Sequence, residues 1–166
     1  MNLEEEQREI WRIYKYALIH VGVDFTREDV QEALELCVEG LEDACRTTIR
    51  YWKENNKKIE QASAFFIKAL YEQWQPYYWN AAWMEDPHFI SPGQKWWQEA
   101  ETGMGTDLRN SLVADVVDSE SGADYIVFNN GRTLTLKLAQ QLGWQKVIDY
   151  AQVPRGVAED QRIAQS

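Results

Sequence analysis

The hydrophobic and polar positions in the first half of the chain repeat with the period of an α-helix. Apolar residues recur every three or four positions in three stretches, each bounded by residues that start or stop helices. The first stretch begins after Asn2, where Glu5 completes a capping box, and it ends at Gly22. The third spans residues 59–75 and stops before Pro76. The pattern therefore predicts that the chain begins as a helical bundle.

The second stretch predicts the longest helix. Thr26 is its N-cap, Asp29 occupies the capping-box position, and Phe25 is placed to pack on Val30 as a hydrophobic staple. The helix is expected to run without a break to residues 55 and 56, with one apolar line of about six turns along it. The residues on this line are Val30, Leu34, Cys37, Leu41, Cys45, Thr48 and Trp52.

Shorter helices are predicted after Pro76. One lies near residues 78–83, a second starts at Ser91 and Pro92, and a third covers residues 106–117. The polar residues 118–122 are typical of a linker.

After the linker the period changes to that of β-strands. The segments DYIVF and RTLTL are rich in β-branched and aromatic residues, and the Asn130-Gly131 pair between them favours a hairpin turn. A second interpretation is that Thr133 caps a helix and only residues 124–128 are extended. Two short helices, residues 139–142 and 144–150, are expected to follow.

These elements predict a mainly α fold, with a helical bundle of about five helices followed by a small C-terminal β-hairpin and short helices. The predicted domains are a helical domain over residues 1–118, a small α+β subdomain over residues 119–153 and a flexible tail over residues 154–166. A chain of 166 residues, 45% of them hydrophobic, is long enough to bury such a core.

The acidic composition limits the partners that we expect. Seventeen Lys and Arg against 27 Asp and Glu give a net charge of −10, which repels nucleic acid and anionic membrane surfaces. No apolar run approaches the roughly 20 residues of a transmembrane helix, and the start MNLEEEQRE lacks the basic region of a signal peptide. We therefore expect a cytosolic protein without a membrane partner, in which Cys37 and Cys45 are reduced core thiols.

Aromatic side chains are concentrated between positions 65 and 97, where eleven of them lie. They either fill a core or form a docking surface for another protein, a role in which Trp and Tyr are favoured. Lys68 and Lys95 are the only basic residues in this stretch, too few for the basic groove of a nucleic-acid stacking platform. The part after Pro76 lacks a clean helical stripe and is the candidate docking surface. Its residues are Tyr77, Tyr78, Trp79, Trp83, Trp96 and Trp97.

Basic residues gather on the second predicted helix. Arg46, Arg50, Lys53 and Lys57 are spaced so that they share one ridge, which is a candidate phosphate-binding edge. The alternative is structural, because basic residues near a helix C-terminus complement the helix dipole. Arg132, at the tip of the predicted hairpin, is a further candidate for contact with a partner.

No catalytic, metal or cofactor motif stands out. His20 and His88 lack the spacing of metal ligands, and nothing in the sequence places a base beside Cys37. We therefore expect a non-enzymatic interaction protein, without metal or cofactor, that binds another protein. The first alternative is a nucleic-acid-associated accessory protein that uses the basic ridge, and the second is an enzyme that acts on a small molecule.

One segment resembles a known family. Trp52-Lys-Glu-Asn, then Ile59, and the run AFFIKALYEQWQP that ends at Pro76 are similar to helical segments of bacterial and plasmid DNA replication proteins of the DnaD-like, helicase-loading type. The resemblance covers residues 26–76 and implies a replication-associated helical scaffold. The DNA-contacting pattern of that family, Tyr-x-x-x-Ile-x-x-x-Trp, would end on Trp52, but this chain has Ala44 and Thr48 in place of the Tyr and Ile.

Overall fold

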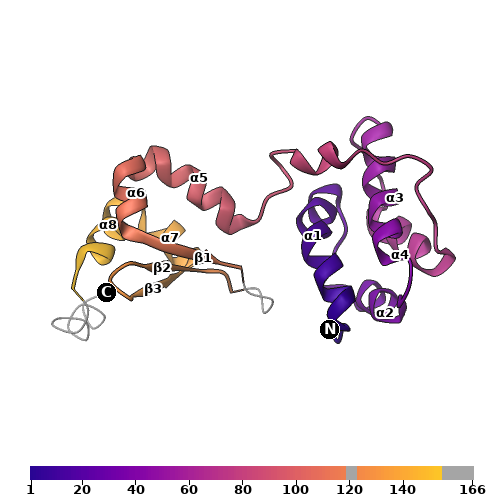
Figure 1. Ribbon diagram of the computed structural model, residues 1–166, viewed down its shortest axis with the longest axis horizontal. Coiled ribbons are helices and arrows are strands. Elements are labelled where there is room, and N and C mark those ends of the chain that lie inside the picture. The colour runs from indigo at the N-terminus through magenta and orange to yellow at the C-terminus, as the bar shows by residue number, and fades with distance from the viewer. Residues whose placement is uncertain (119–122, 155–166) are drawn as a thin grey trace. The chain divides into compact units, whose positions relative to one another are not determined.

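The computed structural model describes residues 1–118 and 123–154 and divides the chain into two compact units (Figure 1). Unit 1 is Met1–Ile90, and unit 2 begins at Ser91. Each unit buries a hydrophobic cluster of its own. The prediction of a mainly α fold with a small β element is confirmed.

Unit 1 is helical. Its elements are α1 (Glu5–Val21), α2 (Glu28–Leu36), α3 (Leu41–Glu54), α4 (Ala62–Glu72) and the 3-10 helix η1 (Ala81–Glu85). Helix α1 starts later than predicted because Glu4, not Asn2, forms the capping box, with Gln7 as its partner. Its predicted end at Gly22 is confirmed, since this residue has a φ of 117°.

The long second helix predicted from the sequence is wrong, because the chain breaks between α2 and α3. The buried Gln7 side chain, which comes from α1, donates hydrogen bonds to the carbonyls of Leu34 (3.1 Å) and Cys37 (2.7 Å) at the end of α2. Gly40 then takes a left-handed φ of 83° as the N-cap of α3, a conformation that glycine adopts without strain. All seven positions of the predicted apolar line are nevertheless buried. The sequence pattern therefore predicted correctly which residues are buried, but it did not predict that two helices carry them.

Unit 2 packs helices on a small sheet. Its elements are α5 (Pro92–Met104), α6 (Thr106–Leu112), β1 (Val113–Val117), β2 (Tyr125–Phe128), β3 (Thr133–Thr135), α7 (Leu136–Leu142) and α8 (Trp144–Gln152). The strands form an antiparallel sheet in the order β1-β2-β3. The predicted hairpin is therefore confirmed as β2 and β3. Thr135 ends β3 and caps α7, because its hydroxyl accepts a hydrogen bond from the N–H of Leu138 at 3.2 Å.

Strand β1 was predicted as the second half of a helix over residues 106–117. Helix α6 ends at Leu112, and Val113 pairs with Phe128 while Val116 pairs with Ile126. Valine is β-branched and fits a pleated surface, so pairing with β2 outweighs the helical spacing of this segment.

The predicted domain boundary at residue 118 differs from the division observed at Ile90 and Ser91. Helix α5 contributes Trp96, Ala100 and Met104 to the same buried cluster as Ile126 and Phe128 of the sheet. Because that core includes α5, the helix belongs with the sheet and not with the first bundle. The predicted linker lies mostly, and the predicted tail almost entirely, outside the described residues.

Candidate functional site

The segment after α4 folds back over the helices of unit 1, and we call residues 76–90 the strap. In Figure 1 the strap passes beside α3, and η1 lies within it. Two arginines of α3 hold its first part, since the guanidinium carbon of Arg50 lies 3.5 Å from the ring centre of Tyr77 and that of Arg46 lies 5.3 Å from the ring centre of Trp79. These cation–π contacts fix the strap on the face of α3.

The predicted basic ridge is not one exposed edge. Arg46 donates from Nε to the hydroxyl of Tyr14 at 2.9 Å and pairs with Glu42 at 3.3 Å. Arg50 is buried and pairs with Glu54 at 3.0 Å. Lys57 lies beyond the end of α3, with a φ of 58°. The four residues therefore do not form one exposed ridge, because Arg46 and Arg50 make contacts within unit 1. Of the other two, Lys53 lies in α3 and Lys57 does not.

The four aromatic residues at the start of the strap differ in exposure. Tyr77 is 84% exposed and Tyr78 is 55% exposed, whereas Trp79 and Trp83 are partly buried. The ring of Trp79 meets that of Tyr14 edge to face at 6.3 Å, and the Trp83 ring contacts both Trp79 (5.3 Å) and Tyr78 (5.5 Å) in the same way. Trp79 thus anchors the strap, and the two tyrosines face solvent.

Trp96 and Trp97 belong to unit 2 and do not share the strap. Trp96 is 2% exposed and packs against Trp144 at 5.4 Å between ring centres, so its prediction as a docking residue is wrong. Trp97 is partly buried beneath Arg109, whose guanidinium carbon lies 4.2 Å from the ring centre. Consecutive residues of a helix point in different directions, so Trp96 lies inside the core cluster and Trp97 packs against it from a partly exposed position.

Arg132 does not project from the hairpin tip as the sequence suggested. The side chain is buried, with its guanidinium carbon 3.9 Å from the ring centre of Tyr150 in α8. Beside it, Asn130 donates from Nδ2 to the carbonyls of Ala151 (3.0 Å) and Val153 (2.7 Å). The hairpin tip therefore holds the C-terminal end of α8, which is a structural role.

The last part of the strap is held by stacked rings. The imidazoles of His20, at the end of α1, and His88 lie 4.8 Å apart at 17°. Trp52 and Phe89 pack against His20 at 5.5 and 5.9 Å. In the part of the chain that the structure describes, no three His, Cys, Asp or Glu side chains are placed to hold a metal ion.

Acid is expected to weaken this end of the strap through Asp86. Desolvation of its carboxyl opposes ionisation, but hydrogen bonds from the N–H and ring of His88, both at 2.9 Å, outweigh it and lower the pKa of Asp86 below its usual 3.8. A lowered folded-state pKa stabilises the protein above the unfolded pKa, and this contribution is lost as the pH falls through the folded value. Asp86→Asn should therefore lower the free energy of unfolding at neutral pH. The difference from wild type should begin to shrink near the usual Asp pKa of about 4 and should vanish only below the lower folded-state pKa. Urea unfolding of both proteins across this range measures it; a difference independent of pH would contradict it.

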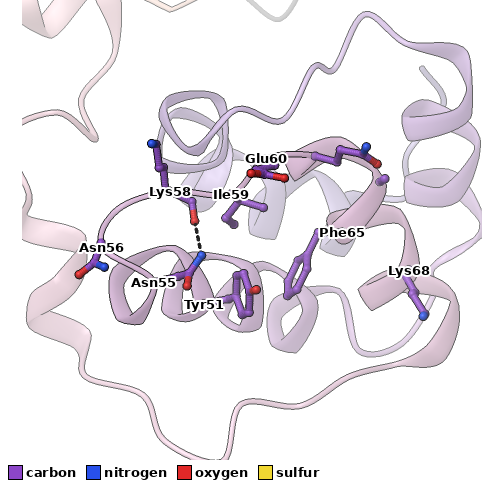
Figure 2. Close-up of a pocket in the computed structure, with 10 residues that line it drawn as sticks. Tyr51, Asn55, Asn56, Lys58, Ile59, Glu60, Phe65 and Lys68 are labelled. Atoms are coloured by element: carbon purple, nitrogen blue, oxygen red, sulfur yellow. Dashed lines mark hydrogen bonds between the residues drawn. The ribbon is translucent and has the colours of Figure 1, made fainter.

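A cleft that the sequence did not reveal lies between the end of α3 and the start of α4 (Figure 2). Tyr51 and Phe65 stack in it with ring centres 4.6 Å apart at 29°, and Asn55, Asn56 and Lys58 line one side. Tyr51 lies beside the apolar line of α3 and is not one of its members, so the hydrophobic pattern did not single it out. The dense run of amide and lysine side chains after it was the available hint.

The DNA-contacting pattern of the family that this chain resembles would fall on the buried face of α3. Ala44 and Thr48 are both fully buried, and the Thr48 hydroxyl donates to the carbonyl of Ala44 at 2.8 Å. The positions that carry Tyr and Ile in the DNA-contacting pattern are therefore core positions in this chain.

Comparison of the chain with protein-family models, with curated proteins and with solved structures found no match. Among the described residues, none of the helices combines the length and apolar character needed to cross a membrane.

Proposed function

We propose that this chain is a non-enzymatic interaction protein that docks a partner protein on the strap, through Tyr77 and Tyr78 with Trp83 at their side. One observation supports this above all. The ring of Tyr77 is 84% exposed, yet it lies 3.5 Å from the Arg50 guanidinium carbon and is fixed there.

A fixed, exposed ring suits a binding hot spot. Tyr brings a large contact area with few rotatable bonds, and Tyr, Trp and Arg are the residues most enriched at hot spots. Arg50 is itself buried and ion-paired, so the Tyr77 ring loses little conformational freedom when a partner covers it. Trp79 and Trp83 hold the backbone beneath, which favours docking without refolding of the strap.

Fewer observations support the alternative that the chain is an enzyme. Burial raises the pKa of both thiols, Cys37 and Cys45, and so keeps them protonated. Their geometry fits core packing, and the proposal therefore assigns no nucleophile.

The second candidate is a nucleic-acid-associated accessory protein, and the resemblance over residues 26–76 favours it. Of the basic ridge, Arg46 and Arg50 are engaged with Glu42 and Glu54. Contact with phosphates would thus rest on Lys53 and Lys57. The resemblance also suggests that a docked partner of the first candidate belongs to the DNA replication machinery.

Site-specific crosslinking tests the docking proposal. A photoreactive phenylalanine analogue at position 77 should crosslink a defined protein in cells that express the chain, and the same analogue at Tyr71 should not. Tyr71 is the matched control because it is a tyrosine of α4 with 56% exposure. With the captured protein purified, Tyr77→Ala should weaken binding about thirtyfold, the size of a hot spot, and Tyr71→Ala should leave it unchanged.

Two outcomes would overturn the proposal. One is equal crosslinking from positions 77 and 71, and the other is an affinity that Tyr77→Ala does not change. An affinity that falls steeply with salt and responds to Lys53→Ala and Lys57→Ala would instead support contact with phosphates.

A further inference from the structure

The cleft between α3 and α4 is separate from the strap and has the size of a ligand site. Its volume is about 610 Å³, and it is open to solvent. Small-molecule sites measure about 300–1,000 Å³. Figure 2 shows the Tyr51 and Phe65 rings side by side in it, between α3 and the start of α4.

The rings form a row whose free end lies in the cleft. Trp74 meets Phe65 edge to face at 5.3 Å, and Phe65 stacks on Tyr51 at 4.6 Å. Phe65 is therefore covered by rings on two sides, whereas Tyr51 remains 43% exposed. A planar ligand stacked on the exposed part of Tyr51 would extend this row.

Amide groups flank the free end of the row. Asn55 and Asn56 line the cleft from the end of α3, and Gln61 lines it from the start of α4. Asn55 donates from Nδ2 to the backbone carbonyl of Lys58 at 2.9 Å, and this hydrogen bond holds the connecting loop. The side-chain oxygen of Asn55, Oδ1, is left as an acceptor. An amide offers a donor and an acceptor in one plane, which matches the polar edge of a nucleobase.

The lining of the cleft has a small positive charge although the chain is acidic. Two lysines and one glutamate line it, whereas the whole chain has a net charge of −10. Lys58 and Lys68 line the cleft together with Glu60. This balance suits a ligand of low negative charge and not a long polyanion, which the rest of the chain would repel.

We infer that this cleft binds a nucleotide unit. Its base stacks on Tyr51, its polar edge meets the amides of Asn55 and Asn56, and its phosphate lies near Lys58. The same unit is found in a free nucleotide and in a short stretch of single-stranded nucleic acid. An aromatic peptide side chain would also stack, but it would use neither the amides nor the lysines. The site does not depend on the strap or on its partner.

Nuclear magnetic resonance titration of the full chain tests this inference with adenosine monophosphate, with inorganic phosphate, with tryptophan amide and with a hexamer of deoxyadenylate. The nucleotide at millimolar concentration should shift the side-chain amide signals of Asn55 and Asn56 through the ring current of its base. Inorganic phosphate and tryptophan amide should each bind at least tenfold more weakly. If only the hexamer binds in the cleft, the nucleotide unit is supplied by a nucleic-acid strand.

Variants locate the site. Tyr51→Ala should weaken binding about tenfold, within the range found when one stacking ring is removed, and Tyr51→Phe should not. Lys58→Ala should weaken binding and reduce its salt dependence, and Tyr71→Ala is the control for an exposed ring outside the cleft. The inference is overturned if neither the nucleotide nor the hexamer shifts these signals, or if tryptophan amide binds as tightly as the nucleotide. A Tyr77→Ala variant that keeps nucleotide binding separates this result from the docking proposal.

Discussion

Replacing Trp96 with alanine is expected to destabilise unit 2 by about 3–5 kcal/mol, the usual cost of removing a large buried aromatic side chain. The Trp96 ring is 2% exposed and packs against Trp144, in the cluster that also contains Ile126 and Phe128 of the sheet. Because small domains are stable by only about 5–15 kcal/mol, this loss should remove much of the stability of unit 2.

Amide hydrogen exchange of the whole chain measures this effect in each unit. Protection should fall at Ile126 and Val147 in unit 2 and should be unchanged at Leu18 and Ile49, which are buried in unit 1. Trp97→Ala is the matched control, since Trp97 is the next residue of the same helix but is partly exposed. It should cost less than Trp96→Ala. Equal losses for the two variants would mean that the core of unit 2 is not built around Trp96.

The contrast between Trp96 and Tyr77 shows why the aromatic stretch was hard to interpret from sequence. Both belong to a Pro-interrupted stretch of rings without a clean periodicity, and both were candidate docking residues. Trp96 faces the sheet of unit 2, while Tyr77 lies on a buried arginine of unit 1. Which ring is buried depends on elements far away in the chain, and local composition does not contain that information.

The apolar line of the second predicted helix is the opposite case. Every residue from Val30 to Trp52 on that line is buried, because a helical spacing of apolar side chains reports burial directly. The break within it combines a local feature, the left-handed glycine that caps α3, with hydrogen bonds from Gln7, about 30 residues away in the chain. Strand β1 is formed by the pairing of Val113 and Val116 with β2. Contacts between distant segments therefore contribute to where these elements begin and end.

The cleft at Tyr51 was missed for a related reason. Its rings, Tyr51 and Phe65, come from two helices, and neither lies on the apolar line of its own helix. The polar loop between them has the pattern of a helix end and gives no sign of a cleft. A site formed where two elements meet is visible from sequence only when their packing is known.

Gly103→Ala is expected to destabilise unit 2 by about 1–3 kcal/mol, as overpacking of a core does. Helix propensity alone predicts the reverse, because alanine is favoured over glycine inside a helix by about 1 kcal/mol. Gly103 lies within α5, and a Cβ atom there would clash with Cε2 and Cδ2 of the Trp144 ring. Trp144 is the first residue of α8, is partly buried and packs against Trp96, so moving its ring away from a Cβ atom would disturb that packing.

A double-mutant cycle with Trp144→Ala separates the two effects. In that background the clash is gone, and Gly103→Ala should become stabilising by up to about 1 kcal/mol. Gly105→Ala is the control, because Gly105 has open space around its Cβ position but a φ of 88°. Its cost comes from backbone strain and should be the same whether or not Trp144 is present. If Gly103→Ala were equally destabilising in both backgrounds, contact with Trp144 would not be what requires glycine at this position.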